Sequence, residues 1–326
     1  MPSGSIRRTI QSVASSPLTR TAVAVGTIAL PVVSLPLLVY WNRDLLAAQL
    51  HHIRWVYVVA AACLYSADLF IAAWTWASLL DTIAGPLPLR THLRYYCIAN
   101  IAKRLPGTVW YVAGRGYLYM RQGLSLRIVS LVSGIELAIT LVAGAMVSLM
   151  FAAPWLGQRG LQAAFLFGGA ILGLTLIHPR LVRYYLRLIK VEGSPAVSYT
   201  SLVRWLVSYV LIWVLGGIVF FLIAQVAADL EPAMLPRFIG SWSLAGLAST
   251  LLFFFPTNFG VTELTLTALL SVYMPSSLAL LVAVLARVFI LALDALWAAV
   301  ALGRDRSCLT TRATLLRAPD SKNGAS

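Results

Sequence analysis

Five charged side chains interrupt stretches of the sequence that are otherwise apolar. They are Asp68, Glu136, Glu263, Arg287 and Asp294. A lone charge at the centre of a lipid bilayer costs about 2.5–3.5 kcal/mol, so such residues usually pair with one another or line a pathway. Carboxylates in this setting can hold a cationic head group or a proton, and guanidinium groups can hold a phosphate. The alternative is that each pair only locks two helices together.

The signs of these charges suggest two pairs. Arg115 and Glu136 are of opposite sign, and so are Glu263 and Arg287. Arg287 and Asp294 are seven residues apart, which places them on one face of a helix. Among the remaining charges, Asp68 has polar neighbours in sequence, Tyr65 and Ser66, and we interpret it as a satisfied polar contact.

We find no catalytic motif in the sequence. The four histidines lack the spacing of a zinc-binding helix, and neither a phosphate-binding loop nor a nucleophile elbow is present. The three cysteines, Cys63, Cys97 and Cys308, do not have the spacing of a metal or redox site. The sequence therefore predicts a protein that is not an enzyme and that uses no cofactor or metal.

The elements that must position these charges are membrane-spanning helices. The chain has 326 residues, of which 60% are hydrophobic and 11% charged, whereas soluble proteins carry about 25% charged residues. A spanning helix needs about 20 apolar residues. Six stretches meet this requirement: about 22–41, 55–80, 126–153, 160–178, 205–228 and 277–302.

Two further apolar regions are interrupted by helix-breaking residues. The region 92–120 is broken at Pro106 and Gly107, and the region 238–274 is broken between Pro256 and Gly260. Proline lacks an N–H donor and glycine loosens the backbone, so each site should end a helix. The predicted fold is therefore an all-α polytopic integral membrane protein, with about six full spans and two interrupted helical hairpins that are either re-entrant or broken.

The distribution of basic residues predicts the orientation. If the N-terminus lies inside and each interrupted region begins and ends on one side, 20 of the 25 Lys and Arg residues fall on the inner segments. Inner loops carry an excess of such residues. We therefore expect both termini to be cytoplasmic, and the formal net charge of +14 does not require nucleic acid as a partner.

The two interrupted regions have matching contexts. Pro106 precedes Glu136 by 30 residues, and Pro256 precedes Arg287 by 31. Paired interrupted helices in oppositely oriented halves indicate an inverted repeat with a transport site near the bilayer midplane; the alternative is two broken helices without symmetry. We expect a cytoplasmic arm and first span at 1–54, a membrane domain at 55–302, and a disordered basic tail at 303–326. The halves of that domain are about 55–153 and 205–302, joined by the linker span 160–178.

The residues around both breaks resemble the lysylphosphatidylglycerol synthetase transmembrane-domain family. The first segment runs from Asn100 through Lys103, Arg104 and Leu105-Pro106-Gly107, followed by Arg115 and by Gly123-Leu124-Ser125. The second runs from Pro256 through Gly260 to Glu263, and Glu136 and Arg287 match later charged positions of the family. Near the second break the family is often richer in glycine, where this chain has Thr257 and Asn258.

The resemblance implies a flippase-like membrane domain without the soluble synthetase domain. We therefore expect a translocase in the plasma membrane for a phospholipid or lipid-linked substrate, with membrane lipids as partners. The residues expected to bind the substrate are Lys103, Arg104, Arg115, Glu136, Glu263 and Arg287. The alternatives are a non-transporting accessory subunit of a membrane glycosyltransferase or lipid-modifying pathway, and a membrane-embedded transferase.

Overall fold

The protein is seen in a computed structural model that describes most of the membrane domain. The described residues are 54–102, 109–156, 197–251 and 261–316, together with single positions between 168 and 184. Every regular element among them is a helix. The prediction of an all-α chain is therefore confirmed for the part of the chain that the structure describes.

The helices form two series of the same kind, each with a long helix, two shorter helices and a second long helix. The first series is α4 (Trp55–Ala84), α5 (Leu89–Ala102), α6 (Val109–Met120) and α7 (Leu126–Leu156). The second is α10 (Tyr199–Ala227), the short 3₁₀ helix η1 (Pro232–Met234), α11 (Leu235–Leu251), α12 (Val261–Leu270) and α13 (Ser276–Leu316).

Four of the described helices contain a segment long and apolar enough to cross a membrane. These segments are Trp55–Ala84, Leu126–Phe151, Tyr199–Ala227 and Ser276–Gly303. They coincide with four of the six spans predicted from the sequence. The predicted span 22–41 and most of the predicted span 160–178 lie outside the described residues.

Two helix boundaries differ from the predictions by more than the others. Helix α10 begins at Tyr199 rather than at 205, because the Ser198 hydroxyl accepts a hydrogen bond from the Ser201 N–H at 3.2 Å and caps the first turn. Helix α13 continues past the predicted end at 302 to Leu316, where a disordered tail was expected from 303. The extension contains three Arg and three Leu residues, which favour the helix.

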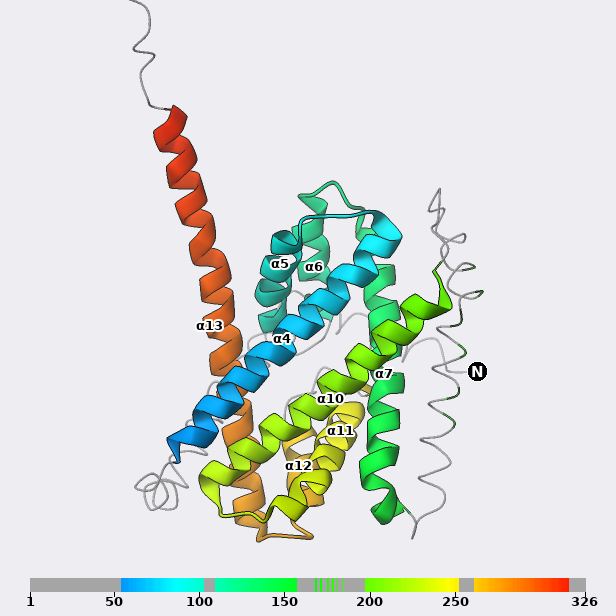
Figure 1. The fold of residues 1–326 in the computed structure, drawn as a ribbon, viewed down its shortest axis with the longest axis vertical. Coiled ribbons are helices and arrows are strands. Elements are labelled where there is room, and N and C mark those ends of the chain that lie inside the picture. The colour runs from blue at the N-terminus through cyan, green and yellow to red at the C-terminus, as the bar shows by residue number, and fades with distance from the viewer. Residues whose placement is uncertain are drawn as a thin grey trace, which may run out of the picture.

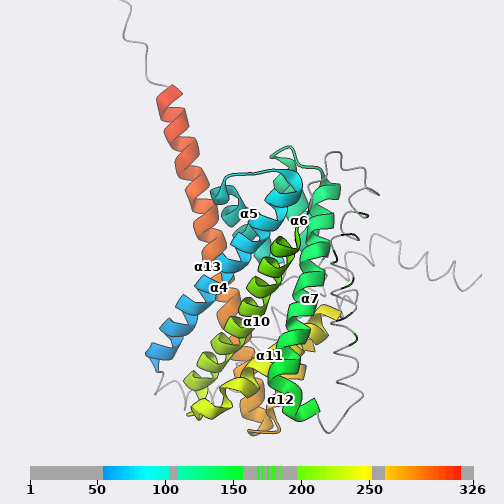
Figure 2. The ribbon, with the colours of Figure 1, turned by 45° about the vertical axis from the view of Figure 1, so that its right-hand side comes forward.

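The two short-helix pairs lie at opposite ends of the bundle. Helices α5 and α6 lie at the upper end in Figures 1 and 2, and α11 and α12 lie at the lower end. Long helices connect the two ends: α4 packs along α10, α7 packs along α11, and α13 packs along α5. Each short pair is therefore held against a long helix of the other series.

Small residues allow α7, α10 and α11 to approach one another closely. The Trp213 ring of α10 lies against Gly144 of α7 and Gly246 of α11, where an added Cβ would be 2.9 Å and 2.4 Å from the ring. The Trp213 indole N–H also donates to the Thr140 carbonyl oxygen at 2.9 Å. The ring is thus fixed between three helices, and neither glycine position has room for a side chain.

The two ends of the bundle also differ in charge. Basic residues gather at the end of the bundle where α5, α7 and α10 begin and α6 ends. We call this the basic end, and its described basic residues are Arg90, Arg94, Arg121, Arg127 and Arg204. Arg204 donates from Nη2 to the Ser78 hydroxyl at 2.9 Å and so joins α10 to α4 there. At the opposite end Arg54 pairs with Asp229 at 2.9 Å, and its hydrogen bond holds the pKa of that exposed carboxyl below its usual value.

Candidate functional site

A cavity of about 470 Å³ lies between the two series of helices. All eight described α-helices contribute side chains to its wall. The described charged residues on the wall are Asp68, Glu136, Glu263 and Arg287, and its large aromatic residues are Tyr65, Tyr96, Tyr111, Tyr209, Trp213 and Trp242. Three residues predicted from the sequence to bind a substrate, Glu136, Glu263 and Arg287, therefore line one cavity.

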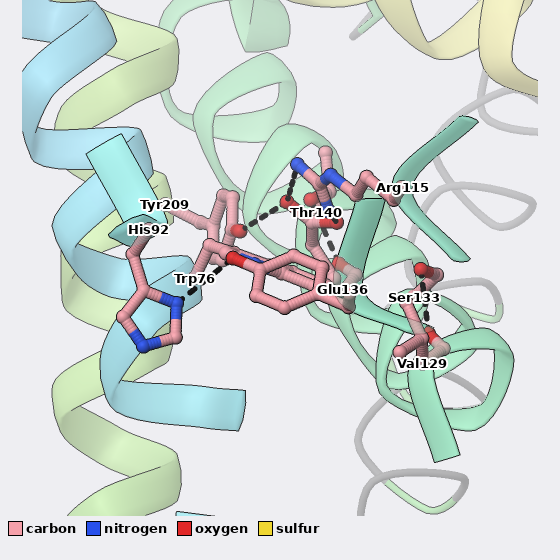
Figure 3. A network of polar contacts seen from close by, with 9 residues as sticks. Trp76, His92, Arg115, Val129, Ser133, Glu136, Thr140 and Tyr209 are labelled. Carbon is pink, nitrogen blue, oxygen red and sulfur yellow. Dashed lines mark hydrogen bonds and ion pairs between the residues drawn. The ribbon is translucent and has the colours of Figure 1, made fainter. Parts of the chain in front are cut away.

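The first ion pair joins α6 to α7 through Arg115 and Glu136. Arg115 Nη1 lies 2.5 Å from Glu136 Oε2, and Nη2 lies 3.4 Å from Oε1. The Tyr209 hydroxyl of α10 donates to the same Oε1 at 2.8 Å, as Figure 3 shows. Glu136 is therefore held by donors from two helices, while its side chain still contributes to the cavity wall.

Aromatic rings enclose the Arg115 guanidinium. Its central carbon lies 3.8 Å from the ring centre of Trp76, 4.0 Å from that of Tyr111 and 4.6 Å from that of Tyr96. Such cation–π contacts stabilise a desolvated guanidinium. Arg115 is fully buried and is not among the residues on the cavity wall. Arg115, which was expected from the sequence to bind the substrate, therefore holds Glu136 from behind and does not line the cavity.

The second ion pair joins α12 to α13 through Glu263 and Arg287. Arg287 Nη1 lies 3.1 Å from Glu263 Oε1, and the two side chains are 15% and 14% exposed. Glu263 lies in the first turn of α12, where the helix dipole favours an anion. Its second oxygen, Oε2, has no hydrogen-bond partner among the described residues. This pair is therefore more accessible than the first and has an unused acceptor.

Asp294 lies two turns beyond Arg287 on α13 but is placed differently. It is buried and accepts hydrogen bonds from the Tyr65 hydroxyl and from Asn100 Nδ2, the latter at 2.7 Å. Tyr65 and Asn100 both line the cavity, so Asp294 fixes part of the wall from behind. Asp68, which we interpreted as a local polar contact, is itself on the wall.

Several predicted residues fall outside the described part of the chain. They are Lys103 and Arg104, the first break at Pro106 and Gly107, and the second break at Pro256 and Gly260. At the first break, helix α5 ends at Ala102 and α6 begins at Val109. At the second, α11 ends at Leu251 and α12 begins at Val261. The roles assigned to these residues stay predictions.

A comparison with protein families decides the relationship that the two sequence segments suggested. The family model of the lysylphosphatidylglycerol synthase transmembrane region matches residues 20–298, which is most of the chain. The chain belongs to this family. Together with the apolar helices, this shows a helical integral membrane protein of a family associated with lipid pathways. No curated protein matched the chain.

This lysylphosphatidylglycerol synthase transmembrane region also contains a buried polar network beside the first ion pair, which was not predicted from the sequence. His92 Nε2 lies 2.9 Å from Asp81 Oδ1, and His92 Nδ1 lies 2.8 Å from the Tyr119 hydroxyl. That hydroxyl also accepts from the Trp76 indole N–H at 2.9 Å. The Trp76 ring also faces the Arg115 guanidinium, which is paired with Glu136. The network therefore connects Asp81, in the last turn of α4, with the cavity wall at Glu136.

The residues of this network carried little signal in the sequence. His92 is isolated along the chain, and its partners come from α4 and α6. Tyrosine and tryptophan are frequent in apolar spans, so Tyr209 and Trp76 do not stand out among similar residues. To predict that these side chains meet, one would have to know which face each helix turns toward its neighbours.

Proposed function

We propose that the chain is a flippase-like translocase for a phospholipid or a lipid-linked substrate. The observation that supports this most strongly is the cavity wall, where carboxylates, a guanidinium and six aromatic rings from both series of helices surround one space. A polar head group crosses hydrocarbon only at a large desolvation cost. Fixed partners on a cavity wall would replace the water of the head group while the acyl chains stay in lipid.

The two ion pairs would have different parts in this process. Glu263 and Arg287 are partly exposed and face the cavity, so a head group can displace either partner of the pair. Its phosphate would take the place of the carboxylate beside Arg287, or its cationic group would take the place of the guanidinium beside Glu263. Glu136 is held by Arg115 and Tyr209 and would stay in place as a fixed acceptor. Lys103 and Arg104, next to the first predicted break, would bind a phosphate.

We infer further that the two series of helices form an inverted repeat. Three features support this: the matching order of long and short helices, the position of the short pairs at opposite ends, and the packing of α7 along α11 and of α13 along α5. In such repeats the site lies near the midplane, and access alternates between the two faces. With the basic end inside, both termini are cytoplasmic and the α5–α6 and α11–α12 hairpins enter the plasma membrane from opposite sides.

The test is lipid movement in liposomes that contain the purified full chain. Fluorescent phospholipids with several head groups, and an isoprenoid-linked lipid, would be followed between leaflets by chemical quenching of the outer leaflet. Wild type would be compared with Glu263→Gln and with the control Asp229→Asn, which removes an exposed carboxylate that does not line the cavity. We expect faster movement with wild type and with the control, and slow movement with Glu263→Gln.

Two results would count against the translocase. One is that no lipid moves faster than in empty liposomes, with or without a membrane potential or a pH gradient. The other is that Glu263→Gln is as active as wild type, which would remove the second ion pair from the pathway. If movement occurs only with a co-purified glycosyltransferase, the accessory-subunit alternative becomes the better account.

A further inference from the structure

A second cavity, of about 660 Å³, lies on the other side of α5. Its wall comes from α4, α5 and α13 and from the turn after α6, and it shares no described residue with the first cavity. We call it the α5–α13 groove. It is therefore a separate site, which the proposed transport function does not use.

The groove combines two arginines with an apolar wall. Arg90 and Arg94 are four residues apart on α5 and so lie on one helix face. Phe70, Leu93, Trp297 and Val300 provide apolar surface, and none of the described lining residues is acidic. A positive end beside an apolar channel has the charge and polarity of a site for an amphiphile with an anionic head group.

Hydrogen bonds and ring contacts hold the wall of the groove in place. The Trp297 indole N–H donates to the Ser66 hydroxyl at 3.0 Å, and the Trp297 ring meets the Phe70 ring edge to face at 4.8 Å. On the other rim Gln122 Nε2 donates to the Tyr95 hydroxyl at 2.9 Å. The aromatic wall and the Gln122 rim are thus formed in advance, so little ordering of these side chains is needed when a ligand binds.

The position of the groove indicates where its ligand comes from. Arg90 lies at the basic end, where residues of a membrane protein meet the head groups of the leaflet. Val300 on α13 is 40% exposed and its neighbours Leu296 and Leu302 are 54% and 52% exposed, so this rim belongs to the apolar outer surface of the bundle. A lipid can therefore enter sideways, with its head group near the arginines and its chains along α13.

We propose that the α5–α13 groove binds one anionic phospholipid from the leaflet at the basic end. Arg90 and Arg94 bind its phosphate through charge-assisted hydrogen bonds. Its acyl chains lie against Trp297 and Val300. Because α5 and α13 belong to different halves of the chain, the lipid bridges the halves at this end without entering the central cavity.

Native mass spectrometry of the full chain in detergent tests this site directly. The probes are dioleoyl-phosphatidylglycerol, dioleoyl-phosphatidylcholine and inorganic phosphate. The variants are Arg90→Ala with Arg94→Ala, which removes the charge, and Val300→Trp, which fills the apolar channel and keeps both arginines. The matched control is Arg121→Ala with Arg127→Ala, two exposed arginines at the same end that do not line the groove.

We expect wild type and the control pair to retain one phosphatidylglycerol in preference to phosphatidylcholine. Loss of the charge-assisted hydrogen bonds should weaken phosphatidylglycerol binding about tenfold or more in the Arg90 and Arg94 double variant. Val300→Trp should also weaken it, which separates a lipid from a free anion. Far-UV circular dichroism and gel filtration of each variant establish that it is folded.

Three results would overturn the proposal. The first is equal phosphatidylglycerol binding by wild type and by the folded Arg90 and Arg94 double variant. The second is equal retention of phosphatidylcholine and phosphatidylglycerol, which would indicate an apolar groove without charge selection. The third is displacement of the lipid by millimolar inorganic phosphate together with no effect of Val300→Trp, which would indicate a simple anion site.

Discussion

Replacing Glu136 with glutamine should destabilise the protein, because the change leaves the Arg115 charge without its partner in a fully buried place. Arg115 is 0% exposed, and Glu136 is its carboxylate partner through two guanidinium nitrogens. Removing one member of a buried ion pair costs about 3–5 kcal/mol. The three aromatic rings around Arg115 remain and offset part of this loss, so we expect a decrease near the lower value, about 3 kcal/mol.

The same substitution at Glu263 is the matched control. Arg287 and Glu263 are 15% and 14% exposed and line the cavity, so water in the cavity can reach the Arg287 charge that the substitution leaves behind. We expect Glu263→Gln to lower the free energy of unfolding by only about 1 kcal/mol. A double variant, Glu136→Gln with Arg115→Met, removes the trapped charge and should recover a large part of the stability lost in the single variant.

The assay is reversible unfolding in mixed micelles, with increasing mole fraction of a denaturing detergent and far-UV circular dichroism as the signal. The four proteins are wild type, the two glutamine variants and the double variant. If Glu136→Gln and Glu263→Gln are destabilised equally, burial does not distinguish the two ion pairs. If the double variant is no more stable than Glu136→Gln, the trapped Arg115 charge is not the cause of the loss.

Three further predictions concern function, packing and topology. Glu263→Gln should slow lipid movement in liposomes while expression and melting stay near wild type, and a parallel loss of stability and activity would instead assign the pair to folding. Gly246→Ala should lower the free energy of unfolding by about 1–3 kcal/mol, since the new Cβ would lie 2.4 Å from the Trp213 ring; unchanged detergent unfolding would show that the ring can move aside. Single cysteines near Gly107 and near Asn258, in a background without native cysteines, should react with an impermeant thiol reagent from opposite sides of the membrane, and labelling of both from one side would contradict the inverted repeat.

The class of the protein could be predicted from the sequence because it depends on local properties. A span is recognised from the hydropathy of about 20 consecutive residues, and four predicted spans coincide with described helices. The family was recognised from two short segments around Pro106 and Pro256, and the family comparison confirmed it. Where a boundary was missed, as at Tyr199, the cause was a capping hydroxyl outside the apolar run.

The opposite signs of the two charge pairs were also visible in the sequence, but their different surroundings were not. Both pairs consist of one arginine and one glutamate, and both follow a predicted helix break. The structure encloses Arg115 among aromatic rings, away from the cavity, and leaves Arg287 on the cavity wall. This difference depends on how α6 and α13 are rotated and on which helices cover them.

Such surroundings are decided only by tertiary structure, because their members come from distant parts of the chain. Glu136 receives its third hydrogen bond from Tyr209 on α10, and His92 binds residues of α4 and α6. Hydropathy indicates that each of these helices is apolar, but it does not indicate which neighbour each face meets. The packing of α4 along α10 and of α7 along α11 sets those faces, and with them the cavity in which the separate charges come together.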